Sequence, residues 1–170
     1  WGQGAIADLD SVRAAFAGQD FVFLLVGPRS PALSNQDPRS DAVQSIVATL
    51  DILDIARQTG VGKVLFASSG GTVYDPKSPA PYAETAPTEP ITAYGIAKLA
   101  IEKYLALYRE TFGLNYHVLR IANAYGPGQL PGGSQGVVAA LAFQALKGGP
   151  VQIWGDGSVV RDFVYVDDVS

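Results

Sequence analysis

Apolar residues gather in three short segments that are separated by longer amphipathic stretches. Residues 21–26, FVFLLV, follow a polar stretch and end at Gly27 and Pro28, which is typical of a strand buried on both faces of a parallel sheet. Residues 63–67, KVLFA, predict a second buried strand, and residues 115–121, NYHVLRI, predict a third strand. We therefore expect three strands.

Between these runs, apolar residues recur at helical spacing. Residues 39–59 carry one apolar stripe and stop at Gly60, and residues 92–111 form an alanine- and leucine-rich stretch that ends near Phe112 and Gly113. A strand, a helix and a strand in this order predict parallel pairing with a right-handed crossover. The stripe of the first helix comprises Val43, Ile46, Val47, Leu50, Leu53 and Ala56.

The chain opens with a weaker pattern. Asp10 or Ser11 is the expected N-cap of a short helix, which Gly18 ends. Residues 2–7 have the form G-x-G-x-x-A, but a dinucleotide-binding loop needs a strand before its glycines and a helix directly after them. We do not assign that role to them. The apolar positions of the short helix are Val12, Ala15 and Phe16.

Proline and glycine mark the remaining segments. Residues 31–38 and the proline-rich residues 76–90 predict loops. Towards the end of the chain, Ser134 is the expected cap of another helix, residues 151–154 predict a short strand, and residues 159–166 alternate around Arg161 and Asp162. The expected inward positions of this last helix are Val137, Val138, Leu141 and Ala145.

Composition narrows the class of protein. With 48% hydrophobic and 16% charged residues, the 170-residue chain is expected to fold around a well-filled core. A net charge of −4 argues against nucleic acid or an anionic membrane as the main partner, and no apolar run is long enough to cross a bilayer. The absence of cysteine excludes disulfides and thiolate metal sites and makes the cytoplasm the expected compartment. Because methionine is absent and position 1 is Trp1, we interpret the chain as a fragment or a processed form.

Tyr94 and Lys98 are one helical turn apart and therefore project from the same helix face. A phenol titrates near pH ~10, and a nearby ammonium favours its ionised form, so the pair is a candidate for proton transfer. The alternative is that Tyr94 packs on the sheet while Lys98 is solvated. The spacing alone does not decide between the two.

Four stretches, in this order along the chain, favour a proton-transfer role for Tyr94 and Lys98, because together they resemble the extended short-chain dehydrogenase/reductase family. The likeness is to its NAD-dependent nucleotide-sugar epimerase/dehydratase branch, and it extends over essentially the whole chain. The stretches are SSGGTVY at residues 68–74, YGIAK at 94–98, LRIANAYGPGQ at 119–129 and GDGSVVRDFVYVDD at 155–168.

The resemblance implies an α/β fold, a Rossmann-like doubly wound and mostly parallel sheet that binds NAD, with NADP not excluded. Residues 1–128 would form part of this cofactor-binding domain, and residues 129–170 would begin a smaller lobe that grips a nucleotide sugar. The family's first strand and glycine-rich phosphate loop are expected before Trp1. We therefore expect the isolated chain to bind cofactor poorly, and the intact parent to be a homodimer built partly through the Tyr94 helix.

The family's catalytic residues map onto this chain with one gap. In similar enzymes, the tyrosine at the position of Tyr94 takes a proton from a sugar hydroxyl, and the lysine at the position of Lys98 binds the nicotinamide ribose. Gly70 stands where the family usually has Ser or Thr. Thr72 is the first choice to replace that hydroxyl, with Ser69 the second. The alternative is that both hydroxyls only cap backbone groups.

Further residues match cofactor and substrate contacts of the family. Asn123 resembles a phosphate contact, although turn residues also favour asparagine, and Arg161 resembles the diphosphate-binding arginine, unless it pairs on the surface with Asp162. Trp154 falls near the base pocket or is a plain core residue. The expected cofactor contacts are Asp8 and Leu9 at the adenine and Leu25, Val26 and Gly27 beneath the cofactor, together with Tyr94 and Lys98.

Departures from the family pattern bear on the reaction. Family dehydratases carry Asp-Glu, and the decarboxylases keep a Glu, where this chain has Gly71 and Thr72, so an epimerase resembling UDP-glucose 4-epimerase is favoured. A keto-sugar reductase and a catalytically idle nucleotide-binding relative stay open as alternatives. Leu24 and Ser45 replace a usual His and Asn; we interpret Leu24 as a packing residue and Ser45 as a loss for the site. His117, in mid-strand, is interpreted as structural.

Overall fold

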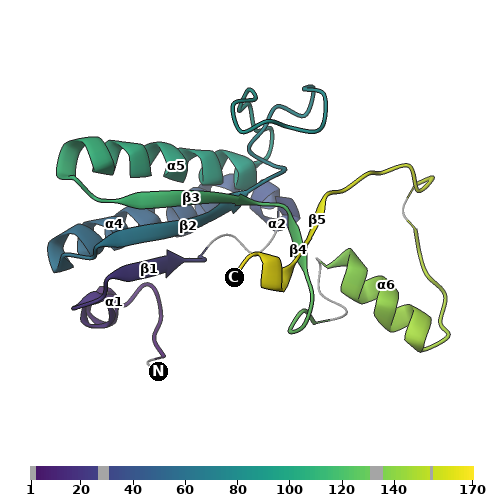
Figure 1. The fold of residues 1–170 in the computed structure, drawn as a ribbon, viewed down its shortest axis with the longest axis horizontal. Coiled ribbons are helices and arrows are strands. Elements are labelled where there is room, and N and C mark those ends of the chain that lie inside the picture. Colours follow the sequence, from purple (N-terminus) through teal and green to yellow (C-terminus); the bar gives the residue numbers. More distant parts are fainter. Residues whose placement is uncertain (1–2, 27–30, 131–135, 154) are drawn as a thin grey trace. The chain divides into compact units, whose positions relative to one another are not determined.

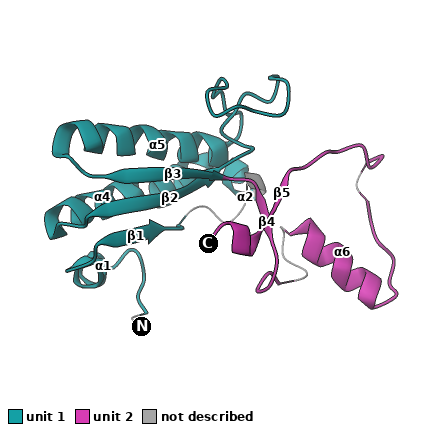
Figure 2. Cartoon of the chain, viewed as in Figure 1, with its two compact units in different colours: residues 1–120 teal, residues 121–170 magenta. Residues whose placement is uncertain are grey.

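The structure is a computed structural model and describes residues 3–26, 31–130, 136–153 and 155–170. The chain divides into two compact units, Trp1–Arg120 and Ile121–Ser170 (Figure 2). The boundary between these units, after Arg120, lies earlier in the chain than the domain boundary expected after residue 128. That domain boundary stays a prediction. No described helix is both long enough and apolar enough to span a membrane.

A three-stranded sheet is the centre of the first unit. Its strands are β1 (Phe21–Leu24), β2 (Lys63–Ser69) and β3 (Tyr116–Ile121), in the order β1-β2-β3 (Figure 1). β1 and β2 are parallel, with Phe21 opposite Lys63 and Leu24 opposite Phe66. The three predicted strands and the parallel pairing of the first two are confirmed.

One face of this sheet is covered by helices. Helix α4 (Ala48–Thr59) and helix α5 (Ala93–Phe112) pack against the side chains that β1 and β2 point to that face, and helix α1 (Leu9–Phe16) contacts α4. The buried cluster is made of Val22, Leu24, Ile52, Leu53, Ala56, Val61, Val64, Phe66, Ile101, Leu105, Tyr108 and Leu114.

The expectation that β1 is buried on both faces is wrong. Val22 and Leu24 lie in the core, but Phe21 and Phe23 are 58% and 66% exposed. An apolar run shows only that the side chains on both faces of the strand are apolar. Burial also requires an element on each face, and in the described part of the chain the helices cover one.

Residues 31–59 hold more structure than the sequence predicted. Residues expected as loop form helix α2 (Pro31–Gln36), and the single predicted helix is a succession of α3 (Pro38–Ala42), a π-helical turn η1 (Val43–Val47) and α4, which Gly60 ends as expected. A π turn holds more residues than an α turn, so a stripe counted at α-helical spacing loses phase across it. Val43 and Val47, expected to face inward, are therefore about half exposed, whereas Leu53 and Ala56 are buried.

The ends of α1 and α5 show how capping sets helix boundaries. α1 is capped by Asp8, not by Asp10 or Ser11, because the Asp8 carboxylate accepts hydrogen bonds from the Ser11 amide at 3.3 Å and from its hydroxyl at 2.6 Å. α5 begins after Thr92 and ends at Gly113, whose φ of 71° suits glycine, as predicted. Residues 70–92 contain no helix or strand, which confirms the proline-rich loop.

The second unit is smaller and less buried. Strands β4 (Asn123–Tyr125) and β5 (Phe163–Tyr165) pair in parallel, followed by a 3-10 turn η2 (Val166–Asp168). β4 was not predicted, only part of the alternating stretch 159–166 is strand, and residues 151–153 are not strand. The rings of Tyr125 and Tyr165 lie 5.6 Å apart and stabilise the pair.

Helix α6 (Val137–Leu146) is present but its environment differs from the prediction. Gly136 occupies the N-cap position, and Ser134, the expected cap, lies outside the described residues. α6 has no buried residue, and Val137 and Leu141 are 51% and 40% exposed. The expected inward-facing stripe is therefore wrong for the described chain, because no described element covers that side of the helix.

Candidate active site

Side chains bind two of the amides in the first turn of α5, which carries Tyr94. The Thr92 hydroxyl accepts a hydrogen bond from the Gly95 amide at 3.1 Å. The Asn35 side-chain oxygen, from α2, accepts one from the Ala93 amide at 2.9 Å. The positive end of the helix dipole at this start favours negative charge nearby, so this is a suitable place for a phenol that must ionise.

Lys98 lies on the same side of α5, at the carboxyl end of β2. Its ammonium donates a hydrogen bond to the Ala67 carbonyl at 2.7 Å and lies 4.7 Å from the centre of the Phe66 ring. The Lys98 Nζ is 5.7 Å from the centre of the Tyr94 ring. The structure thus brings Tyr94 and Lys98 together, and Lys98, at 4% exposure, is not a solvated lysine.

Burial controls the ionisation of both groups. Desolvation lowers the pKa of Lys98 from 10.5 to about 8 and raises the pKa of the half-buried Tyr94. The expected lowering of the tyrosine pKa by the amine is therefore wrong for this structure, because desolvation of the phenol outweighs it. At neutral pH Tyr94 keeps its proton, and most Lys98 side chains are charged.

The low pKa of Lys98 predicts a pH-dependent stability. Below about pH 8 the folded protein holds a buried charge that the unfolded chain solvates, and this cost is relieved as the pH rises towards 10.5. Relative to that of Lys98→Met, we expect the free energy of unfolding of the wild type to increase by up to about 3 kcal/mol across this range. The melting temperatures of both full-length proteins between pH 7 and 10 measure it. Lys103→Met, at an exposed lysine, is the control, and its melting temperature should differ from that of the wild type by a constant amount over this pH range. A constant difference between the wild type and Lys98→Met would contradict the burial of the charge.

Ser69 and Thr72 play different parts at the end of β2. The Ser69 hydroxyl accepts hydrogen bonds from the Thr72 amide at 3.2 Å and from the Gly71 amide at 3.5 Å. The backbone-capping alternative thus describes Ser69. The Thr72 hydroxyl oxygen is buried and has no hydrogen-bond partner among the described residues, so its capacity to bond is unused there.

Gly95 allows the Thr72 loop to lie against the Tyr94 helix. A side chain at this buried position would overlap the Thr72 carbonyl oxygen and would lie 2.9 Å from the Pro90 Cβ. The close approach of loop and helix therefore depends on glycine, and it holds the Thr72 backbone against the turn that carries Tyr94.

We expect Gly95→Ala to destabilise the protein. Overpacking a tight contact costs about 1–3 kcal/mol, of which the better helix propensity of alanine recovers about 1 kcal/mol. A melting temperature lower by several degrees checks this in the full-length protein. Gly71→Ala is the control, because a Cβ on Gly71 has open space and its φ is not positive. Equal stability of both variants would show that the loop does not need the close approach.

Apart from Tyr94 and Lys98, the residues predicted to bind the cofactor lie at the start of α1 and directly after β1. The Asp8 carboxylate is engaged in capping α1, and its hydrogen bonds to Ser11 lower its pKa. Leu9 begins the same helix and is 41% exposed. After β1, Leu25 is 71% exposed, whereas Val26 packs against the core. Gly27 lies outside the described residues.

Two predicted substrate-binding residues come close together in the second unit. Asn123 starts β4, and its amide and side-chain nitrogen both donate to the Asp162 carbonyl, at 3.2 Å and 2.8 Å. Arg161 is exposed and donates to the Val160 carbonyl at 2.9 Å, and no ion pair with Asp162 is found among the described residues. Trp154 lies outside the described residues.

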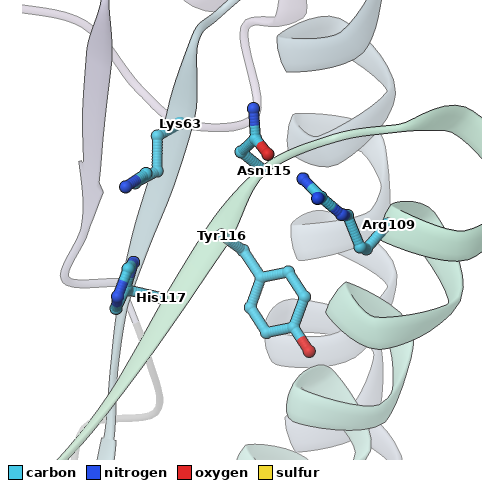
Figure 3. Close-up of a pocket in the computed structure, with 5 residues that line it drawn as sticks. All are labelled: Lys63, Arg109, Asn115, Tyr116 and His117. Atoms are coloured by element: carbon cyan, nitrogen blue, oxygen red, sulfur yellow. The ribbon is translucent and has the colours of Figure 1, made fainter.

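A separate pocket of about 250 Å³ lies at the opposite, amino-terminal ends of β2 and β3 (Figure 3). His117 is exposed there, so it is not a core residue, and its position at the start of β3 is far along the strand from the Ala67 end where Lys98 binds. The lining residues are Lys63, Arg109, Asn115, Tyr116 and His117.

Comparison with known proteins agrees with this geometry. The model of the NAD dependent epimerase/dehydratase family matches residues 1–170. The chain belongs to the NAD-dependent epimerase/dehydratase family. The family resemblance and the Rossmann-like α/β fold predicted from the sequence are thereby confirmed.

Several epimerases of this family are similar to the chain. UDP-glucose 4-epimerase of Mycolicibacterium smegmatis is 40% identical over 163 residues, which cover 96% of this chain and 52% of that protein. The crystal structure of UDP-glucose 4-epimerase with UDP-glucose from Thermotoga maritima matches 99% of this chain and 55% of its own with a TM-score of 0.93 and 41% identity. The Thermus thermophilus UDP-glucose 4-epimerase complex with NAD matches with a TM-score of 0.87 and 38% identity, covering 98% of this chain and 56% of that one. The chain therefore spans about half the length of these family members.

Two departures from the family pattern have different consequences. Leu24 is 3% exposed in the core, which confirms its interpretation as a packing residue. Ser45 is 2% exposed within the π turn, and its hydroxyl oxygen has no hydrogen-bond partner among the described residues. The position is thus buried and polar, but the serine hydroxyl makes none of the hydrogen bonds that a longer asparagine side chain offers.

Sequence reasoning missed a buried polar cluster beside the Tyr94/Lys98 pair. The Ser68 hydroxyl donates a hydrogen bond to Glu102 Oε1 at 2.5 Å. Arg120 donates two more to the same carboxylate, from Nε at 3.1 Å and from Nη2 at 2.7 Å. A signal was present, because Glu102 is four residues after Lys98 and eight after Tyr94, on the same helix face.

Proposed function

We propose that the full-length protein carrying this chain is an NAD-dependent nucleotide-sugar epimerase that inverts C4 of a UDP-glucose-type substrate. The observation that carries the proposal is the approach of Tyr94 and Lys98 at the carboxyl end of β2, the edge where open α/β sheets bind ligands. The similar proteins named UDP-glucose 4-epimerase support the choice of substrate class.

The residues at this edge fit the nicotinamide end of NAD. Lys98 uses one of its three ammonium hydrogens on Ala67, which leaves two for a ribose hydroxyl, and the buried Thr72 hydroxyl lacks a partner. Leu25 offers exposed apolar surface at the end of β1 and Leu9 at the start of α1, while Asp8 marks the adenine end. When bound, NAD supplies a hydride acceptor and donor for the sugar carbon.

Tyr94 is the proton-transfer group in this proposal. Its ionised form, the phenolate, accepts the proton of the sugar hydroxyl while that carbon is oxidised to a ketone, and the resulting phenol returns the proton when the ketone is reduced on its other face. Because burial raises the pKa of Tyr94, ionisation needs positive charge close by. The Lys98 ammonium, 5.7 Å from the ring, supplies part of it. The Thr72 hydroxyl donates a hydrogen bond to the sugar oxygen and helps to orient it.

The same site argues against loss of water from the sugar. Dehydration needs an additional acid and base next to the reacting carbons, and the positions after Gly70 hold Gly71 and Thr72. The buried carboxylate of Glu102 is already shared between Ser68 and Arg120. Epimerisation and ketone reduction need neither group.

Further parts of the proposal concern the second unit and the assembly. Asn123 and Arg161 would bind the phosphates of the nucleotide sugar, with Trp154 near its base and residues 129–170 beginning the substrate-binding lobe. We also propose a cytoplasmic homodimer. The exposed apolar residues of α5, which include Leu107 and Phe112, support a helix–helix contact between two copies.

Product analysis distinguishes the proposed epimerase from its alternatives. The full-length protein is incubated with UDP-glucose and catalytic NAD, and anomeric proton NMR signals report UDP-galactose formation. We expect catalytic conversion without net consumption of the cofactor. Reduction of a 4-keto sugar with stoichiometric loss of NAD(P)H would identify a reductase, and binding of UDP-glucose without turnover would identify an idle relative.

A further inference from the structure

Two neighbouring hydrogen bonds fasten α5 to the carboxyl end of β2. Lys98 donates to the carbonyl of Ala67 at 2.7 Å, and Glu102, one helical turn later, accepts from the hydroxyl of Ser68 at 2.5 Å. Consecutive residues of the strand are thus bonded to consecutive turns of the helix. A bond at one point would let the helix pivot, whereas two bonds fix its rotation and its position along the strand.

Arg120 of β3 completes this arrangement. Glu102 is 8% exposed, and its charge is balanced by the Arg120 guanidinium, which binds both carboxylate oxygens, at 3.1 Å and 2.7 Å. The hydrogen bond to Glu102 raises the pKa of Arg120, so the guanidinium keeps its charge. Carboxylate, hydroxyl and guanidinium therefore all have partners, as a buried polar group requires.

The same guanidinium reaches the loop that follows β2. Its Nη1 donates to the Tyr74 hydroxyl and to the Glu84 carbonyl, both at 3.1 Å, and it lies 4.9 Å from the centre of the Tyr74 ring. Tyr74 in turn packs on Tyr82, with ring centres 5.0 Å apart. The Thr72 segment is therefore held between Ser69 on one side and the Arg120 contacts on the other.

We infer that Glu102, bound by Ser68 and Arg120, is the positioning residue of the site, and that it holds α5 against β2 so that Tyr94 and Lys98 face the reacting atoms. The inference rests on the proposed function. Glu102 touches neither substrate nor cofactor in this role. It acts through the helix, where a displacement of about 1 Å at a catalytic group costs on the order of 100-fold in rate.

A pair of nearly isosteric substitutions at Ser68 tests the hydrogen bond without removing a buried charge. Threonine and valine have nearly the same shape, and each adds a methyl group at this buried position, but valine also replaces the hydroxyl by a second methyl group. In the full-length protein we expect Ser68→Val to lower kcat for UDP-glucose by about 10- to 100-fold relative to Ser68→Thr, with KM changed less than about threefold. Equal kcat values for the two variants would overturn the inference.

Asp54→Asn is the matched control. It breaks the exposed ion pair between Asp54 and Arg57 on α4, whose atoms are 2.7 Å apart. These two side chains meet α5 at Tyr108 and Phe112, which lie beyond Glu102 on the helix. We expect this variant to keep the kcat and KM of the wild type. A loss as large as that of Ser68→Val would show that the assay responds to general weakening of the fold, and it would overturn the positioning role.

The ionisation of Lys98 gives a readout that does not need turnover. Desolvation holds the pKa of its ammonium at about 8, and the groups next to it are Tyr94 on α5 and the Phe66 ring and Ala67 carbonyl of β2, with Glu102 four residues further along α5. If α5 moves away from β2, water reaches the amine and the pKa rises towards 10.5. Loss of the negative charge of Glu102 alone would lower it, so a rise reports displacement.

NMR titration of the ¹³Cε signal of Lys98, assigned by its loss in Lys98→Arg, measures this pKa. We expect a higher value in Ser68→Val and in Glu102→Gln than in the wild type, Ser68→Thr and Asp54→Asn. An unchanged or lower value in both would overturn the inference. If the wild type does not epimerise UDP-glucose, the proposed function fails, and the titration still decides whether Glu102 positions Lys98.

Discussion

Replacing Tyr94 by phenylalanine is expected to lower kcat by about 10²–10⁴-fold, the usual contribution of a positioned general acid–base group. Phenylalanine keeps the ring that lies 5.7 Å from the Lys98 ammonium but has no proton to exchange. Cofactor affinity should stay nearly unchanged, because Lys98 keeps its place on Ala67. Initial rates with UDP-glucose and a binding titration with NAD, both on the full-length protein, measure the two quantities.

Tyr104→Phe controls for the loss of a hydroxyl from the same helix. Tyr104 is 37% exposed on α5, and its variant should turn over at the wild-type rate. A Tyr94→Phe protein with normal turnover would show that another group moves the proton. Joint loss of turnover and of NAD binding would instead show that Tyr94 is needed to build the site.

Replacing Thr72 by valine is expected to lower kcat by roughly 10²-fold, the scale measured for removal of one donor that stabilises a reacting oxygen. Valine has nearly the same shape and lacks the hydroxyl that is buried without a partner in the described chain. Thr72→Ser should retain most of the activity. Steady-state kinetics with UDP-glucose on the three proteins provide the measurement.

Ser69→Ala separates the two candidate hydroxyls. Since Ser69 accepts from the Thr72 and Gly71 amides, we expect this variant to loosen the loop and to lose less activity than Thr72→Val. The reverse order, with full activity in Thr72→Val and a large loss in Ser69→Ala, would transfer the role to Ser69.

Local signals were sufficient for the strands and the long helix. β1, β2 and β3 are short apolar runs bounded by polar or turn residues, and α5 has a strong cap at Thr92 and a glycine at its end. Such signals do not depend on what packs nearby. The Tyr94/Lys98 approach was predictable for the same reason, because residues four apart in a helix share a face.

Features that depend on distant partners were not predictable. The π turn at residues 43–47 displaced an otherwise regular stripe, and the exposure of Phe23 depends on which faces of the sheet are covered. Pairing of β4 with β5 joins segments about 40 residues apart in the chain, and three-residue strands carry little pattern of their own.

The chemistry of the site was only partly predictable. Residue types identified Tyr94, Lys98 and the hydroxyls, but burial, which moves both pKa values opposite to a simple charge argument, is a property of the packed core. Glu102 lies in an ordinary helix-forming stretch of the sequence, and its partners Ser68 and Arg120 are 34 and 18 positions away in the chain.

Whether hydride moves at C4 of the sugar is decided by an isotope at that carbon. The full-length protein is given UDP-glucose deuterated at C4 in ordinary water, and the UDP-galactose formed is analysed by NMR and mass spectrometry. Transfer of hydride to NAD and back, with Tyr94 handling only the hydroxyl proton, predicts that the product keeps its deuterium at C4. Product that has exchanged C4 deuterium for solvent hydrogen, or no product at all, would contradict a Tyr94/Lys98 site that works by hydride transfer.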